Sequence, residues 1–168
     1  MKEVLTMSSI ITVAFSTFKE TSLQLVLELL RALGKQTVED FDVTIVVDGN
    51  RRYFRKLVDE AIHGTGMSRG IDIVFNPVDR GISHSRNIVL QHTKTRYVAY
   101  TDDDAIPHPS WLQELLLAAE LDQKVAAVAG PVLPMWEKEV ENHSSWFPKE
   151  LYWIIGCTPF HVKPYGRP

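Results

Sequence analysis

The sequence predicts an α/β fold, in which a mostly parallel β-sheet carries helices on both of its faces. Short, nearly continuous apolar runs rich in β-branched residues are typical of strands that are buried on both faces. These runs alternate along the chain with amphipathic stretches of helical spacing, which is the order found in parallel α/β sheets. The length of 168 residues and the hydrophobic content of 45% suit one globular domain.

Five apolar runs are predicted to form the strands. Each is short, and most are dominated by β-branched or aromatic residues. In chain order they cover residues 10–15, 43–47, 71–75, 97–100 and 125–129. The second run ends at the turn signal Asp48-Gly49-Asn50. The fourth runs through Thr101 into three adjacent aspartates, Asp102, Asp103 and Asp104.

Four helices are predicted between and after these strands. Apolar residues recur at helical spacing over 23–33, 54–62 and 111–119, and 83–92 reads as a less apolar helix. Thr21 or Ser22 can cap the first helix, and Gly34 fits its C-terminal end. Gly64 and Gly66 close the second helix, and Pro109 with Ser110 opens the fourth.

Composition excludes several classes of protein. Cys157 is the single cysteine, which rules out an intramolecular disulfide framework and a zinc site made of several cysteines. The 18 Lys and Arg against 21 Asp and Glu give a net charge of -3, whereas nucleic-acid binders usually carry a basic excess. No stretch reaches the roughly 18 consecutive apolar residues of a membrane-spanning helix, and no signal peptide is apparent. We therefore expect a cytoplasmic protein that binds no nucleic acid.

The alternating pattern ends after Pro134. Aromatic residues are scattered there among charges and prolines, and the final Tyr165-Gly166-Arg167-Pro168 is typical of neither a helix end nor a strand end. We therefore expect a single domain over residues 1–168 that is incomplete at its C-terminus. Residues 10–130 would form its core, and residues 131–168 would begin an irregular region.

Polar residues follow each of the first four predicted strands. The carboxyl ends of parallel strands meet at one edge of the sheet, and ligands of such folds bind there. The polar loops are residues 16–20, Asp48, residues 76–80 leading to Gly81 and Arg86, and residues 102–104. The sequence therefore predicts one polar site assembled from distant parts of the chain.

The three adjacent aspartates are the sharpest feature of this edge. In an extended segment, residues two apart point to the same side, about 6.6 Å apart, so Asp102 and Asp104 could present two carboxylates to one pocket. Adjacent carboxylates repel one another unless a cation or hydrogen-bond donors compensate. Oxygen ligands suit Mg²⁺ or Mn²⁺, especially where a diphosphate completes the coordination. The alternative is an acidic turn that caps the following helix.

Asp48 and Arg86 also have two readings each. Asp48 could accept hydrogen bonds from a nucleobase or a ribose, or it could serve only the Asp-Gly turn. Arg86 could meet a phosphate near the start of a helix, or it could lie on a solvated helix face.

Four motifs occur in a fixed order along the chain. They are ITVAFSTFKE (11–20), VVDG (46–49), GISHSRN (81–87) and YVAYTDDD (97–104), the last followed by Pro107 and Trp111-Leu112. Over residues 10–130 this ordered set resembles the family 2 glycosyltransferases of the GT-A fold. The resemblance implies a donor-binding core over these residues and the start of an acceptor-side region over 131–168.

The resemblance also implies a donor, a metal and the residues that hold them. The donor would be a sugar linked to UDP, GDP or dTDP, and the cofactor would be Mn²⁺ or Mg²⁺. The metal would neutralise the diphosphate as it leaves. By the same resemblance, Phe15, Thr17 and Phe18 lie around the nucleobase, Asp48 contacts the base, Arg86 lies near the uracil or the phosphates, Asp102 holds the ribose or the metal's water shell, and Asp104 coordinates the metal.

The chain departs from the family at two points. The family usually has two acidic residues before the glycine of the second strand, and this chain has only Asp48. The catalytic base of inverting members lies on a later segment than this chain contains, so no catalytic base is assigned. The acceptor would be a carbohydrate or a lipid-linked molecule, and a lipid-linked acceptor would bring peripheral contact with a membrane.

Three other functions are alternatives to this one. A truncated homologue could bind a nucleotide-sugar or a partner without transferring anything. A sugar nucleotidyltransferase would need a glycine-rich loop after the first strand, where residues 16–20 contain no glycine. A phosphohydrolase with a nucleophilic aspartate would usually carry that motif after its first strand, not its fourth.

Overall fold

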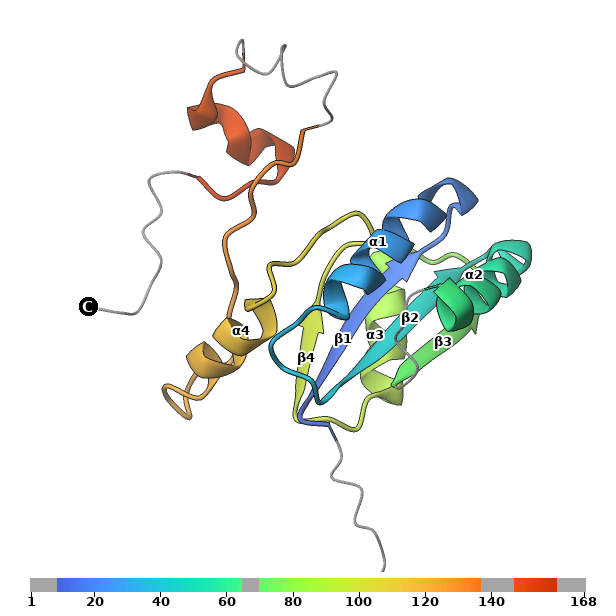
Figure 1. Cartoon of the computed structure of the whole chain (residues 1–168), viewed down its shortest axis with the longest axis horizontal. Coiled ribbons are helices and arrows are strands. Elements are labelled where there is room, and N and C mark those ends of the chain that lie inside the picture. Colours follow the sequence, from blue (N-terminus) through green and yellow to red (C-terminus); the bar gives the residue numbers. More distant parts are fainter. Residues whose placement is uncertain (1–8, 65–69, 137–146, 160–168) are drawn as a thin grey trace, which may run out of the picture. The chain divides into compact units, whose positions relative to one another are not determined.

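The structure is a computed structural model that describes residues 9–64, 70–136 and 147–159. The chain divides into two compact units, Met1–Gln113 and Glu114–Pro168. The ribbon is shown in Figure 1.

A parallel sheet of four strands forms the centre of the first unit. The strands are β1 (Ile11–Thr17), β2 (Phe41–Asp48), β3 (Ile71–Asn76) and β4 (Tyr97–Tyr100). Their order is β3-β2-β1-β4, and every neighbouring pair is parallel. This confirms the predicted sheet with its first and fourth strands adjacent. The strand order reverses beside β1, which places a topological switch point there.

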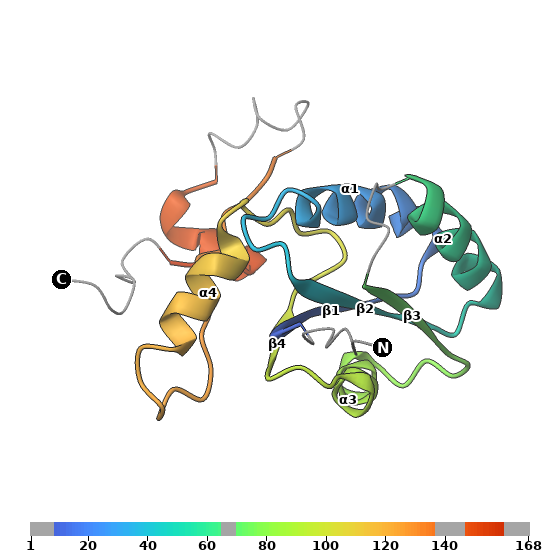
Figure 2. The ribbon, with the colours of Figure 1, turned by 60° about the horizontal axis from the view of Figure 1, so that its bottom comes forward.

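Helices cover both faces of this sheet, as predicted (Figure 2). The helices α1 (Leu23–Leu33) and α2 (Arg51–Gly64) lie on one face, and α3 (Ile82–His92) lies on the other. A short 3₁₀ turn, η1 (Glu20–Ser22), leads into α1. Ser22 and Gly34 lie at the two ends of α1, at the predicted positions, but the Ser22 side chain makes no capping hydrogen bond.

Strand alternation sorts side chains between the two faces of the sheet. Ala14 and Val46 pack with Val89 of α3, so even-numbered residues of β1 and β2 face α3. Odd-numbered residues of these strands therefore face α1 and α2. Five residues of α1 are buried there, and each buried leucine contributes about 1.5–3 kcal/mol relative to exposure.

The helix α4 (Trp111–Ala119) begins where the sequence predicted it. Its first turn is held by Gln36, whose Nε2 donates to the His108 carbonyl at 2.8 Å and whose Oε1 accepts from the Leu112 N–H at 3.0 Å. No helix within the described ranges is both long enough and apolar enough to cross a membrane.

The predicted fifth strand over residues 125–129 is wrong. These residues are irregular, and all of them except the half-buried Val128 are exposed. The Val125 N–H donates to the Asp122 carbonyl at 3.0 Å in a local turn. A strand needs a neighbouring strand to complete its hydrogen bonds, and an apolar run alone does not supply one. Within the described residues the sheet ends at β4.

The second unit contains a small aromatic cluster. The 3₁₀ segment η3 (Lys149–Ile155) carries the buried Tyr152. Phe147 stacks on its ring at 5.9 Å between centroids, and Trp136 meets it edge-on at 5.8 Å. The Thr158 N–H donates to the Val132 carbonyl at 2.9 Å, and the Val132 N–H returns a bond to Thr158 Oγ1 at 2.8 Å.

Candidate functional site

A cleft of about 380 Å³ opens in the first unit at the carboxyl ends of β1, β2 and β4, beside the start of α3. This is the edge at which ligands of open α/β sheets bind. The structure brings six of the seven sequence-predicted site residues to it. They are Phe15, Phe18, Asp48, Arg86, Asp102 and Asp104.

Thr17 is the predicted residue that does not line the cleft. It is odd-numbered on β1, so its side chain faces α2, where its Oγ1 lies 3.1 Å from the Tyr53 hydroxyl. Both side chains are buried. Ser16, on the opposite face of the same strand, lines the cleft instead.

The Asp48 carboxylate is buried and held from two sides. Asn76 Nδ2 donates to Asp48 Oδ1 at 2.6 Å, and Ser85 Oγ donates to Asp48 Oδ2 at 2.5 Å. Asp48 and Asn76 are register partners at the ends of β2 and β3, and Ser85 approaches from α3. Asp48 therefore does more than form the Asp-Gly turn, although Gly49 does adopt a positive φ of 68°.

Arg86 is exposed on α3 at the wall of the cleft. Its guanidinium lies over the Tyr100 ring, 5.4 Å from the centroid, and the Tyr100 hydroxyl donates to the Arg86 carbonyl at 3.1 Å. Burial raises the pKa of Tyr100, and the positive charge of Arg86 partly opposes that rise. Tyr100 therefore stays a neutral hydrogen-bond donor that fixes the position of Arg86.

The three aspartates form a turn and not the extended segment that the sequence suggested. The Ala105 N–H donates to the Asp102 carbonyl at 3.3 Å, and Asp103 and Asp104 lie within the turn. Because the segment bends, the two-residue periodicity expected for Asp102 and Asp104 does not apply. The alternative, an acidic turn that caps the following helix, is confirmed for the turn and wrong for the cap, because α4 starts only at Trp111.

The aspartate turn presents exposed carboxylates to the cleft. Asp102 and Asp104 are exposed, Asp103 is half-buried, and all three line the cleft. In the described part of the chain, no three His, Cys, Asp or Glu side chains converge into a preformed metal site. Carboxylate oxygens are suitable ligands for Mg²⁺ or Mn²⁺, and an ion here would complete its coordination with water or with oxygens of a bound molecule.

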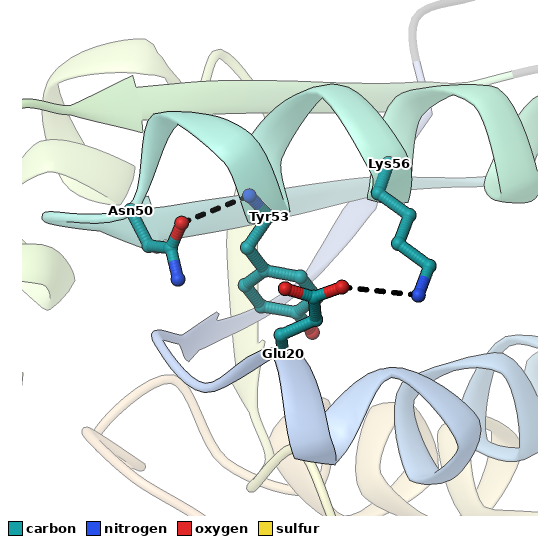
Figure 3. A network of polar contacts seen from close by, with 4 residues as sticks. All are labelled: Glu20, Asn50, Tyr53 and Lys56. Carbon is teal, nitrogen blue, oxygen red and sulfur yellow. Dashed lines mark hydrogen bonds and ion pairs between the residues drawn. The ribbon is translucent and has the colours of Figure 1, made fainter.

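The segment that follows β1 is braced by α2 (Figure 3). Glu20 and Lys56 form an ion pair at 3.1 Å, and Asn50 Oδ1 accepts the Tyr53 N–H at 2.9 Å at the start of α2. Burial raises the pKa of Tyr53; its hydrogen bond to Thr17 opposes the rise, and the charge of Asp103 adds to it. Tyr53 is thus held neutral beside the end of β1, where its hydroxyl meets Thr17.

A sequence model of glycosyl transferase family 2 matches residues 9–164. The chain belongs to this family. A glucosyl-dolichyl phosphate glucuronosyltransferase of Haloferax volcanii is 34% identical over 130 residues, which are 77% of this chain and 39% of that protein. An uncharacterized glycosyltransferase of Haemophilus influenzae is 25% identical, over 67% of this chain and 34% of that protein. The chain thus spans less than two fifths of the length of these relatives.

Solved glycosyltransferase structures share the fold of the family 2 chain. A mannosyltransferase from Pyrobaculum calidifontis, in complex with GDP-Man and Mn²⁺, matches with a TM-score of 0.53 and 24% identity over 62% of this chain and 30% of its own. S. aureus TarS 1–349, in complex with UDP-GlcNAc, matches with a TM-score of 0.55 and 21% identity over 74% of this chain and 37% of its own. These likenesses show the α/β fold of the GT-A type.

Sequence reasoning about this family 2 site missed the residues that support Asp48 and Arg86. Asn76, Ser85 and Tyr100 each bond to one of them. Asn76 carried a signal, since it is the polar residue that ends a predicted strand. Ser85 and Tyr100 stand in two of the ordered motifs, but their contacts with Asp48 and Arg86 depend on which face of a helix or strand they occupy, which the motifs do not reveal.

Proposed function

We propose that this chain binds a nucleotide-diphospho-sugar in the cleft and serves a metal-assisted glycosyltransferase whose acceptor is a carbohydrate or a lipid-linked molecule. The observation that carries the proposal is the convergence of Asp48, Arg86 and the aspartate turn on one cleft at the switch point of the sheet. Membership of the family supports the same reading.

Each part of the cleft suits one part of the donor. Asp48 offers a hydrogen-bond acceptor to the nucleobase from the floor of the cleft. The half-exposed ring of Phe18 offers apolar surface on which the base can pack. Phe15 borders the cleft but is buried, so its role is to support this side of the cleft. Arg86 offers a planar, permanently charged donor to the phosphates. Thr17 holds Tyr53 and supports the nucleobase loop from behind.

Asp102 and Asp104 are the residues that would hold Mn²⁺ or Mg²⁺. Their hard oxygens fit these ions, and their exposure leaves room for the diphosphate oxygens that complete the coordination. When bound, such an ion neutralises the charge that grows on the leaving diphosphate. The mannosyltransferase with a similar fold was solved in complex with GDP-Man and Mn²⁺, and TarS was solved in complex with UDP-GlcNAc. Both complexes support a nucleotide-diphospho-sugar as the donor of this chain.

The test is a set of UDP titrations with and without Mn²⁺, on the wild type and on Asp104→Asn. Mn²⁺ should tighten UDP binding to the wild type, because ion and diphosphate complete each other's sites. Asp104→Asn removes a charge at constant size, so Mn²⁺ should no longer tighten UDP binding. Asp72→Asn, at an exposed position of β3 outside the cleft, is the matched control and should behave as the wild type.

Equal UDP affinities in the wild type and Asp104→Asn, with and without Mn²⁺, would contradict the proposed metal site. GDP and dTDP titrated in parallel identify the base of the donor. If the wild type bound none of the three nucleotides, the proposed function itself would be contradicted.

A further inference from the structure

The Asp48 carboxylate is fixed by contacts on both of its oxygens. Asn76 reaches Oδ1 from β3, and Ser85 reaches Oδ2 from α3. Asp48 and Asn76 are 6% exposed and Ser85 is 1% exposed, so water competes little for these bonds. Two donors from two separate elements leave this carboxylate one orientation.

The fixed carboxylate still has capacity for a ligand. An ionised carboxylate has about four lone-pair sites, and the protein donors occupy two of them. Asp48 lines the cleft, so the remaining sites are available from there. A group that is acceptor-only selects a ligand that brings an N–H or O–H to it, and it repels one that presents a lone pair.

Nucleobases differ in this property at one ring position. Uracil and thymine carry a ring N–H at N3, and guanine carries one at N1. Cytosine and adenine present a lone pair at the corresponding atoms. A rigid Asp48 therefore separates the two groups of bases, whereas a mobile Asp48 can turn its carboxylate away from the ring lone pair and toward the amino group of cytosine or adenine.

We propose that Asn76 and Ser85 are positioning residues that fix Asp48 so that the cleft selects nucleobases with a ring N–H. This proposal rests on the proposed function, because it assumes a nucleotide in the cleft. It concerns how the base is discriminated and not whether a nucleotide binds.

The test compares UDP with CDP, which differ at ring positions 3 and 4. Both are titrated in the presence of Mn²⁺ into the wild type, Ser85→Ala and Ser83→Ala. Ser83 lies exposed on the same helix and does not line the cleft, so it is a matched control. The wild type and Ser83→Ala should prefer UDP by at least about tenfold, the usual value of one hydrogen bond to a charged group.

Ser85→Ala should lose most of that preference, mainly because its affinity for UDP falls. The ratio of the UDP and CDP affinities does not depend on how much of the variant is folded. A smaller folded fraction lowers the apparent affinity for both nucleotides by the same factor. Asn76→Ala is the second variant and should lower the same ratio. If the panel of nucleotides identifies guanine as the base, GDP and ADP replace UDP and CDP.

The outcomes separate the two proposals. A wild type that binds no nucleotide overturns both of them. A wild type with a strong preference that Ser85→Ala and Asn76→Ala both retain overturns the positioning role alone. A wild type that binds UDP and CDP equally overturns the selection and leaves the proposed function standing.

Discussion

Arg86 has a planar cationic group held at a wall of the cleft by an aromatic ring. The Tyr100 ring below its guanidinium and the Tyr100 hydroxyl on its carbonyl fix both ends of the residue. A cation held in advance loses little freedom when a phosphate arrives, and this lowers the cost of binding. Arg86 should therefore matter more for affinity than its exposure suggests.

Arg86→Ala should weaken UDP binding about 10- to 150-fold, the range for loss of a hydrogen bond to a charged partner. Isothermal titration in the presence of Mn²⁺ measures it. Arg55→Ala, at an exposed position of α2 away from the cleft, is the control and should leave the affinity unchanged. An Arg86→Ala protein with wild-type affinity would show that Arg86 does not contact the nucleotide.

The buried Tyr53 should make the protein less stable in alkali. Burial raises its pKa above the ordinary value of 10.0, so the folded state keeps a proton that the unfolded state releases. The contribution of Tyr53 is complete below pH 10.0 and is lost as pH rises from there toward the folded pKa. Urea unfolding on both sides of pH 10.0 measures this loss.

Two variants assign the alkaline loss to Tyr53. Tyr53→Phe should be less stable than the wild type near neutral pH, because it leaves Thr17 without its partner, but it should lose less stability above pH 10.0. Thr17→Val removes the same hydrogen bond and keeps the phenol, so it should retain the alkaline loss. The same alkaline slope in Tyr53→Phe and the wild type would contradict this account.

Among the secondary-structure elements, α2 supports the segment after β1 that borders the cleft. Its first residues are capped by Asn50, and further along it Tyr53 and Lys56 reach the segment that carries Phe18 (Figure 3). The helix therefore supports the side of the cleft that Phe18 lines, without lining the cleft itself. A weaker start of α2 should lower the stability of this region.

Asn50→Ala should lower the free energy of unfolding by about 0.5–2 kcal/mol, the usual value of an N-terminal cap. The loss is expected because the Tyr53 N–H would have no side-chain acceptor. Urea denaturation with an unchanged slope measures it. Asn50→Asp keeps an acceptor and adds a favourable charge at the helix start, so it should match or exceed the wild type. Equal stability of Asn50→Ala and the wild type would refute the cap.

The elements that the sequence predicted well are those whose signals are local. Strands β1 to β4 and helices α1 to α4 all lie where apolar periodicity placed them. The run 125–129 failed because its strand character depended on a neighbouring strand, which periodicity does not reveal. The extended conformation expected for the three aspartates was also wrong, because three adjacent aspartates do not indicate whether the backbone is extended or bent.

At the scale of the whole molecule, convergence of the site was predictable and its internal bonding was not. Parallel strands bring their carboxyl ends together whatever side chains they carry, so polar loops far apart in sequence had to meet. The bonds among those loops depend on side-chain direction and helix rotation. This is why the contacts of Asn76 and Ser85 with Asp48, and the turning of Thr17 toward Tyr53, emerged only from the structure.

Ligands should stabilise the whole molecule against heat. A ligand that binds only the folded state at about 100 times its Kd adds about 2.7 kcal/mol, which corresponds to roughly 5–10 °C in Tm for a chain of this size. UDP and Mn²⁺ together should raise Tm by more than the separate shifts combined, because each tightens the other. Thermal unfolding with each alone and with both measures this, and purely additive shifts would contradict the coupling.

The pairing of Asp48 with Asn76 ties the quality of folding to the competence of the cleft. These residues are partners at the last position of the β2–β3 register. A slip of one residue would turn Asn76 to the opposite face of the sheet and leave a buried carboxylate short of a donor. A chain that folded with this error would lose stability, and its Asp48 would lose one of the two donors that fix it in the cleft. The register of the sheet therefore links the stability of the fold to the position of a side chain that lines the cleft.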